Sequence, residues 1–323
     1  MLNNNNFGLN FLDLRNNPTA KAYAKAYNEA LFVSGNVVWG IELSIAEWAA
    51  RCEVNIDPQH EGGRTDVCAL EVALTCPLPP AGVQFVGVRP DLDTFAAVEV
   101  LRIRSAGKKF LAEAVARLMA IAKADKFANG PWLGPQPLPT QNNPWPETGR
   151  RELAAINAAI MDHAVPVNTR QECFSDWLLC DQEPDGYRAK VEAERLDMVR
   201  ALEAGEIQVS LHHNGRVAMV RSLHKAGTMV GYLHAPVALV WNPEFRGMAG
   251  NLPPHLKWTL VQYQEGYADL KPGLLGVLQA GTATHVGEPG CGGSATNINS
   301  TQGESSVWTA DEVVVELEKF LLK

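Results

Sequence analysis

The first third of the chain alternates between strand-like and helix-like segments, and this alternation restricts the fold more than any other feature. Short β-branched or apolar runs predict strands, and apolar residues spaced three and four positions apart predict helices. A chain that repeats strand and helix builds a parallel sheet whose faces the helices cover. The predicted strands are 53–57, 83–88 and the start of 40–52, and the predicted helices are 64–76, 94–104 and 108–124.

The pattern changes in the C-terminal part, where short strands cluster. We therefore predict a boundary near 200–206 that separates two domains, 1–200 and 206–323. The predicted fold class is α/β, with a parallel-sheet N-terminal domain flanked by helices and a smaller α/β C-terminal domain. The C-terminal strands are expected at 207–213, 217–222, 237–242 and 258–264, and a last helix at 309–322 begins with the capping-box spacing of Thr309 and Glu312.

Composition excludes several classes of protein. The 323 residues carry 36 acidic and 28 basic side chains, a net charge of −8, so the chain lacks the electrostatic character of a protein that grips long nucleic acid. It has no uninterrupted apolar stretch of about 18–20 residues, which predicts no membrane span. Its six cysteines form no CxxC pair, and the N-terminus lacks the pattern of a secretory signal. We therefore expect reduced thiols and a cytoplasmic location.

Acidic residues follow two successive predicted strands. Asp57 and His60 follow the first, and Asp91 and Asp93 follow the second, while Asp125 stands near the end of a predicted helix. Carboxylate oxygens suit Mg²⁺ and Mn²⁺, and Mn²⁺ also accepts imidazole. All five residues are therefore predicted metal ligands for Mn²⁺ or Mg²⁺, with His60 and Asp91 as the catalytic pair.

An alternative is that these residues only shape turns and helix caps. Asp93 or Thr94 is suited to cap the following helix, and Asp is common after a strand. The grouping of acids after two strands favours the metal site. Because both strands are expected to be neighbours in one parallel sheet, the carboxylates of Asp57 and Asp91 should lie within about 8 Å, as a site with two metals requires.

A glycine-rich stretch at 287–306 forms the second candidate site. Gly292 and Gly293 could turn successive N–H groups inward to hold an anion, and Ser294 adds a hydroxyl. With Arg89 they are the predicted substrate-binding residues. The alternative is a polar surface loop that connects a strand to the last helix. The adjacent histidines of "LHHNG" (211–215) point to opposite faces of a strand and predict the end of a hairpin.

Three segments resemble motifs of the DHH-family phosphoesterases. "RPDLDTFAAVEVL" (89–101) is similar to the first motif of that family, and "NIDPQHEGG" (55–63) to the DHH motif, in the reverse order along the chain. "CGGSATNINSTQG" (291–303) resembles the Gly-Gly-His motif of the associated domain, with Ser294 in place of the histidine and Arg89 where the first motif usually has His or Asn. The resemblance implies a two-metal phosphohydrolase acting on a small phosphorylated or oligonucleotide substrate.

Two other functions remain open from the sequence. One is a non-catalytic protein that binds an anion or nucleotide through Arg89 and the glycine loop. The other is a metal-dependent hydrolase of carbon–nitrogen bonds, because the same ligands could polarise a carbonyl group. The partner expected in each case is a small molecule, without long nucleic acid or membrane, and a homodimer is one option for the assembly.

Overall fold

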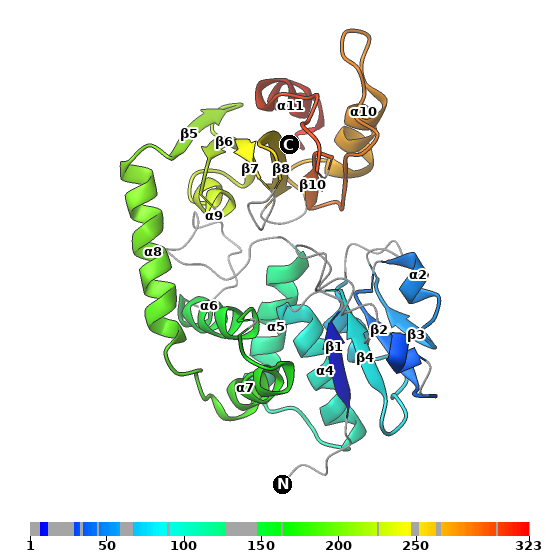
Figure 1. Cartoon of the computed structure of the whole chain (residues 1–323). Coiled ribbons are helices and arrows are strands. Elements are labelled where there is room, and N and C mark those ends of the chain that lie inside the picture. The colour runs from blue at the N-terminus through cyan, green and yellow to red at the C-terminus, as the bar shows by residue number, and fades with distance from the viewer. Residues whose placement is uncertain are drawn as a thin grey trace. The chain divides into compact units, whose positions relative to one another are not determined.

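The computed structural model describes residues 7–11, 29–32, 35–43, 45–58, 67–88, 91–126, 147–162, 164–224, 226–246, 252–262, 266–301 and 303–322. The chain divides into two compact units, one of residues 1–125 with 148–191 and the other of 126–147 with 192–323. The division at 191/192 lies inside helix α8 (Tyr187–Glu203), ahead of the predicted boundary near 200–206. Each unit has its own sheet, so the fold is two-domain α/β (Figure 1).

The first unit contains a four-stranded sheet in which every described pairing is parallel. Its strands, in spatial order, are β1 (Gly8–Phe11), β4 (Gln84–Gly87), β2 (Val38–Ile41) and β3 (Val54–Ile56). The helices are α2 (Ala46–Ala49), α3 (Ala69–Ala73), α4 (Leu92–Ser105), α5 (Ala112–Lys126), α6 (Glu147–Ile160) and α7 (Val167–Cys180). Figure 1 shows α4 and α7 on one side of this sheet.

The strand order corrects one expectation. The predicted strands that became β3 and β4 are not neighbours, because β2 lies between them. Sequence reasoning placed consecutive strands side by side, which holds only as a tendency. Asp57 and Asp91 therefore do not follow adjacent strands.

A buried polar network fixes α7 against α4. Glu99 of α4 is fully buried, and its carboxylate accepts hydrogen bonds from Arg102 at 2.8 Å, Ser175 at 2.8 Å and Gln171 at 3.1 Å. A carboxylate can be buried at this position because three donors satisfy its oxygens. The network holds the helices that cover the parallel sheet.

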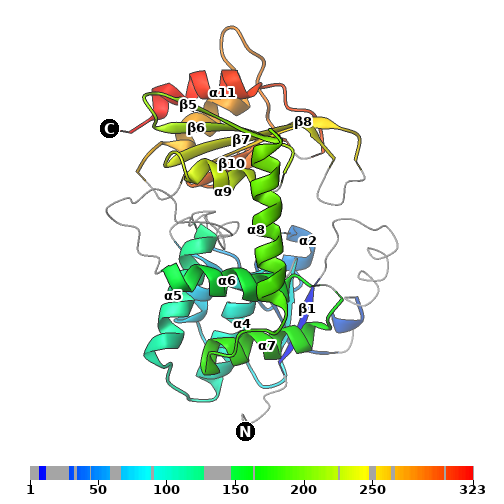
Figure 2. The same cartoon turned by 90° about the vertical axis from the view of Figure 1, so that its left-hand side faces the viewer.

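The second unit contains a six-stranded mixed sheet. Its spatial order is β5 (Ile207–His212), β6 (Val217–Ser222), β7 (Val237–Phe245), β8 (His255–Gln262), β10 (Asn297–Asn299) and β9 (Gly292–Gly293). Only the β6–β7 pairing is parallel among those described. Figure 2 shows α9 (Gly227–Tyr232) and α11 (Ala310–Leu317) on opposite faces. The remaining helical segments are η1 (Leu270–Leu274), α10 (Leu275–Ala280) and η2 (Glu318–Phe320).

Several local predictions for the second unit are confirmed. The strand 217–222 has the predicted bounds, and Thr309 caps α11 in a capping box with Glu312. His213 and Asn214 adopt positive φ at the turn between β5 and β6, so the "LHHNG" segment does end a hairpin. The larger core of this unit lies between the sheet and the helices on the α11 side, where Trp258 and Trp308 are buried.

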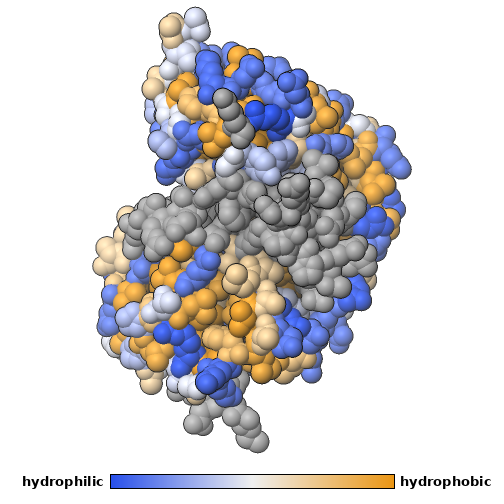
Figure 3. Space-filling model, turned by 180° about the vertical axis from the view of Figure 1, so that it is seen from behind, coloured by the Kyte–Doolittle hydropathy of each residue, from blue (hydrophilic) through white to orange (hydrophobic). Residues whose placement is uncertain are grey.

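Hydrophilic and hydrophobic residues are interspersed over both units on the face shown in Figure 3. Among the described residues, no helix combines the length and apolar character that crossing a membrane requires.

Candidate functional site

Acidic residues gather at the carboxyl edge of the parallel sheet in the first unit. Glu42 directly follows β2, Asp57 directly follows β3, and Asp91 lies a few residues beyond β4. Because the strands are parallel, their carboxyl ends emerge at one edge. Asp57 is buried there. The predicted residues His60 and Arg89 lie outside the described residues.

Asp93 is the most enclosed acid of this edge. Its side chain is 1% exposed and accepts hydrogen bonds from the amides of Ala69 at 2.7 Å and Leu70 at 3.0 Å, the first two residues of α3. Burial is the largest cause that raises the pKa of Asp93 to about 7, and the negative charge of Asp91 adds to it. The carboxylate therefore caps a neighbouring helix and can gain or lose a proton near neutral pH.

Asp91 is the N-cap residue of α4. Its carboxylate accepts a hydrogen bond from the amide of Thr94 at 2.9 Å. Asp93 or Thr94 was expected to cap this helix if the acids only shape turns and caps, and neither of them is its N-cap residue. Asp93 instead lies in the first turn of α4, and its carboxylate accepts hydrogen bonds from the first amides of α3.

Glu42 was not predicted and belongs to the same cluster. It adopts a positive φ of 49° where β2 ends, and its carboxylate accepts a hydrogen bond from the Thr94 hydroxyl at 2.9 Å. Burial raises the pKa of Glu42 well above its ordinary value, and the charges of Asp91, Asp93 and Asp125 raise it further. An acid at the end of a strand is the signal that selected Asp57, and it applies equally to Glu42.

Among the described residues, Asp93, Asp125 and Cys68 form a group of potential metal ligands. One ligand atom from each lies within 4.8 Å of the other two. Burial, followed by the charges of Asp93 and Asp125, raises the pKa of the Cys68 thiol. The structure thus brings together three predicted ligands, Asp91, Asp93 and Asp125, and adds Glu42 and Cys68.

The glycine loop of the second unit uses its polar groups internally. Gly292 and Gly293 form β9, and the amide of Ser294 donates to the carbonyl of Asn297 at 2.7 Å, which closes the hairpin with β10. The carbonyl of Gly293 accepts a hydrogen bond from Lys271 at 3.1 Å. The Ser294 amide is therefore already committed to the hairpin rather than directed at a ligand.

A Cβ on Gly293 would lie 2.0 Å from the carbonyl oxygen of Asn297, and Gly293 has φ +145°. Replacing it with alanine would displace the backbone. The variant would therefore report on the hairpin, and a loss of ligand affinity could not be attributed to an anion nest.

The loop does enclose an anion, which is the side chain of Glu288. The amides of Thr301 and Val307 donate to its carboxylate at 2.7 and 3.0 Å, and the Ser306 hydroxyl donates at 2.6 Å. Burial by itself raises the pKa of Glu288, but these hydrogen bonds outweigh it and leave the pKa below its ordinary value. Gly292, Gly293 and Ser294, on which the anion site was predicted, are not among these donors.

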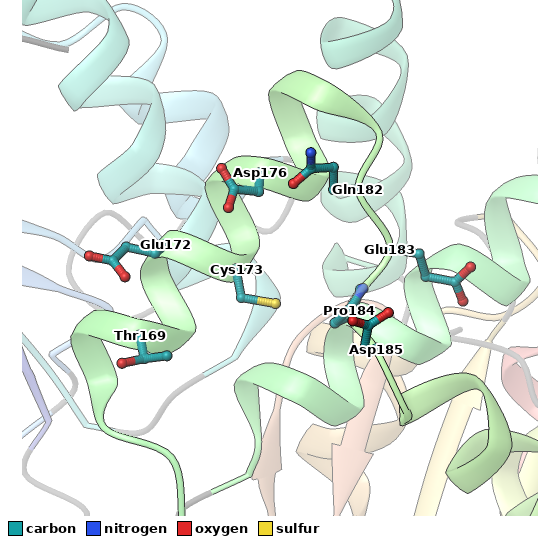
Figure 4. A pocket seen from close by; sticks show the side chains of 8 residues that line it. All are labelled: Thr169, Glu172, Cys173, Asp176, Gln182, Glu183, Pro184 and Asp185. Carbon is teal, nitrogen blue, oxygen red and sulfur yellow. The ribbon is translucent and has the colours of Figure 1, made fainter. Parts of the chain in front are cut away.

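A separate hollow of about 270 Å³ lies beside α7 (Figure 4). It is lined by residues of α7 and of the segment that follows: Thr169, Glu172, Cys173, Asp176, Gln182, Glu183, Pro184 and Asp185. Four of these eight side chains are acidic. Among the described residues these acids do not form a group of potential metal ligands, whereas Cys68, Asp93 and Asp125 do, so the acidic edge of the sheet remains the stronger candidate for phosphate chemistry.

No protein-family model matches the chain, and no curated protein does. The resemblance to the DHH phosphoesterases therefore rests on the quoted motifs alone and stays a prediction.

Proposed function

We propose that the protein is a metal-dependent phosphohydrolase that acts on a small phosphorylated or oligonucleotide substrate. One observation supports this most: acids from several elements converge at the carboxyl edge of a parallel sheet, and the charges of their neighbours help to raise the pKa of Glu42 and of Asp93. Such mutual repulsion disfavours the ionised cluster, and a divalent cation would remove it.

The donor set fits a divalent cation. The two oxygens of Asp93 accept hydrogen bonds from two backbone amides and from the Cys68 thiol, which leaves a lone pair for a metal. Asp125 adds a carboxylate within ligand distance of Asp93, which suits Mn²⁺ or Mg²⁺. Cys68 adds a thiol, which suits Zn²⁺. Asp57 and His60 are proposed as further ligands, following the sequence prediction.

A bound divalent cation lowers the pKa of its water and neutralises charge on a phosphoryl oxygen. The residues of the chain then have separate tasks. Asp93 is held in place by the amides of α3, and Asp91 by the amide of Thr94. Glu42 has a raised pKa and can take up a proton from the attacking water. Arg89 is proposed to bind the phosphate of the substrate.

The six cysteines are all free thiols in the structure. This fits a reducing compartment, and we propose a cytoplasmic location.

The test combines metal content with phosphate release. Purified protein would be loaded with Mn²⁺, Mg²⁺ or Zn²⁺, washed, and analysed for bound metal, and phosphate release from a nucleotide panel would be measured with each. We expect Asp125→Asn to lose bound metal and activity together. Asp176→Asn removes an exposed carboxylate of α7 in the same unit and should change neither. Metal retained in Asp125→Asn, or activity in metal-free protein, would contradict the proposal.

Cys68 favours one alternative, a zinc-dependent hydrolase of carbon–nitrogen bonds. A thiol beside two carboxylates is a donor set that zinc accepts more readily than magnesium does. An amide substrate panel run with the Zn²⁺-loaded protein separates the two functions. Release of ammonia or amine without phosphate release would favour the alternative.

A further inference from the structure

Strand β5 forms one edge of the six-stranded sheet, and in the part of the chain that the structure describes no strand lies beyond it (Figure 1). It pairs with β6 in an unbroken antiparallel register from Ile207 opposite Ser222 to His212 opposite Val217. Its sequence, IQVSLH, contains no proline and no Asp, Glu, Lys or Arg. Proline, charged residues and bulges are the usual features that prevent an edge strand from pairing with another chain.

The hydrogen-bond pattern shows which backbone groups face outward. The amide of Leu223 donates to the carbonyl of Glu206 at 3.1 Å, which makes these two residues a hydrogen-bonded pair of the ladder. Such pairs occur at every second residue of an antiparallel ladder. The N–H and C=O groups of the intervening residues therefore point toward the open edge, and these residues are Ile207, Val209 and Leu211.

The side chains of the same three residues share one face of the strand. Ile207 is buried in the core below α9, Val209 packs partly against that core, and Leu211 is 55% exposed. The open edge thus combines unpaired backbone groups with an exposed apolar side chain. The opposite edge strand, β9, has only two residues and offers no comparable surface.

We propose that two copies of this chain pair through β5 in an antiparallel arrangement, with Val209 opposite the partner's Val209. This register places Ile207 opposite the partner's Leu211, and the reverse contact follows from the two-fold symmetry. Every outward N–H then meets an outward C=O, and the exposed leucine gains an apolar neighbour. The two sheets become one continuous sheet of twice the width.

The polar side chains are compatible with the same register. Glu206 lies two positions before Gln208, so its exposed side chain is on the same polar face. In the proposed register it lies opposite the partner's His212. The pair occurs twice, once at each end of the paired strands. In the middle, Gln208 meets the partner's Ser210, so no like charges meet although the chain carries a net charge of −8.

The expected complex is weak to moderate. One pair of strands buries less than the roughly 1,600 Å² of a standard interface, so the dissociation constant should lie in the micromolar range. Sedimentation velocity of the full chain from about 1 to 300 µM covers that range. We expect the mass to rise from 35.1 kDa toward twice that value with concentration. A monomer at every concentration would overturn the proposal.

Leu211→Lys tests the apolar contact with a change that edge strands tolerate. We expect this variant to remain monomeric over the whole range. Val315→Lys is the matched control, because Val315 is 61% exposed on α11 and receives the same charge. Dimerisation of Leu211→Lys at the affinity of the parent, or an equal loss in the control, would overturn the proposed interface.

A charge exchange tests the register itself. His212→Glu places a glutamate opposite the partner's Glu206 at both ends and should weaken the dimer at least tenfold. Adding Glu206→Arg to the same chain places opposite charges at both ends and should recover most of the lost affinity. A double variant as weak as the single one would show that these two residues do not face each other.

Discussion

The most informative perturbation of the acidic edge is Asp93→Asn. The substitution keeps the size of the side chain and removes a buried carboxylate that accepts the amides of Ala69 and Leu70. The side-chain oxygen of asparagine can accept one of these two amide hydrogen bonds, but its NH₂ group can only donate. One backbone N–H would therefore lose its acceptor. At acidic pH we expect the variant to be less stable than the parent by about 1–3 kcal/mol.

The pH dependence follows from the direction of the pKa shift. Asp93 has a pKa of about 7 in the folded protein against an ordinary value of 3.8, so the folded state holds a proton that the unfolded state has released. The stability from this residue is present in full below about pH 4 and is lost as the pH rises through 7. A shift of about 3 units corresponds to about 4 kcal/mol. Because Glu42 shares the repulsion, we expect an observed change of about 2–4 kcal/mol.

Urea unfolding of metal-free protein, followed by tryptophan fluorescence from pH 4 to 8, measures this change. From pH 4 to 8, the free energy of unfolding of the parent should fall more than that of Asp93→Asn. The difference in stability between the two proteins should therefore vanish or change sign by pH 8. A difference in stability that stays constant within about 0.5 kcal/mol, the usual limit of additivity, would refute the reasoning. Asp93 would then have the same pKa in the folded and the unfolded state. Addition of Mn²⁺ at pH 8 should stabilise the parent and leave the variant unchanged.

Two further variants test the polar groups that hold each unit together. Ser175→Ala removes one of the three donors to the buried Glu99 carboxylate and should lower the free energy of unfolding by about 1–3 kcal/mol in a urea titration. Thr169→Ala changes an exposed residue of the same helix and serves as the control, for which no effect is expected. Glu288→Gln should cost a similar amount at pH 7, and because the pKa of Glu288 is lowered in the folded state, the difference from the parent should shrink as the pH falls through that pKa. A difference independent of pH would contradict the account of the loop.

The local elements could be predicted because they follow from spacing along the chain. The strands around 84–87 and 217–222 and the helix at 92–105 were found from the period of apolar residues. Helix α7 was missed, because its N-cap residue is Pro166, whose side chain cannot cap a helix as Ser, Thr, Asp or Asn does. Strand β1 was missed because its four residues form a strand by pairing with β4, far along the chain.

The site was predicted in part for the same reason. Asp91, Asp93 and Asp125 were selected by their positions at the ends of elements, and the structure brings them together. Cys68 was considered only as a reduced thiol, because its proximity to Asp93 and Asp125 depends on how α3, α4 and α5 pack. Spacing along the sequence carries no information on such packing. The position of β2 between β3 and β4 could not be predicted for the same reason.

Helix capping alone accounts for the positions of Asp91 and Asp93. Glu42 therefore tests whether the cluster also binds a metal. Glu42 caps no helix in the described structure, and Gln at this position could still accept the hydroxyl of Thr94. If the acids serve only the helices, Glu42→Gln relieves repulsion and should stabilise metal-free protein at pH 8 by about 1 kcal/mol or more, and Mn²⁺ should then stabilise neither protein. If the cluster holds a metal, the same variant is more stable without metal, yet it gains less from Mn²⁺ than the parent does. Thermal unfolding of both proteins at pH 8, with chelator and with Mn²⁺, distinguishes these outcomes. We expect the second, and equal metal-induced shifts in parent and variant would remove Glu42 from the site.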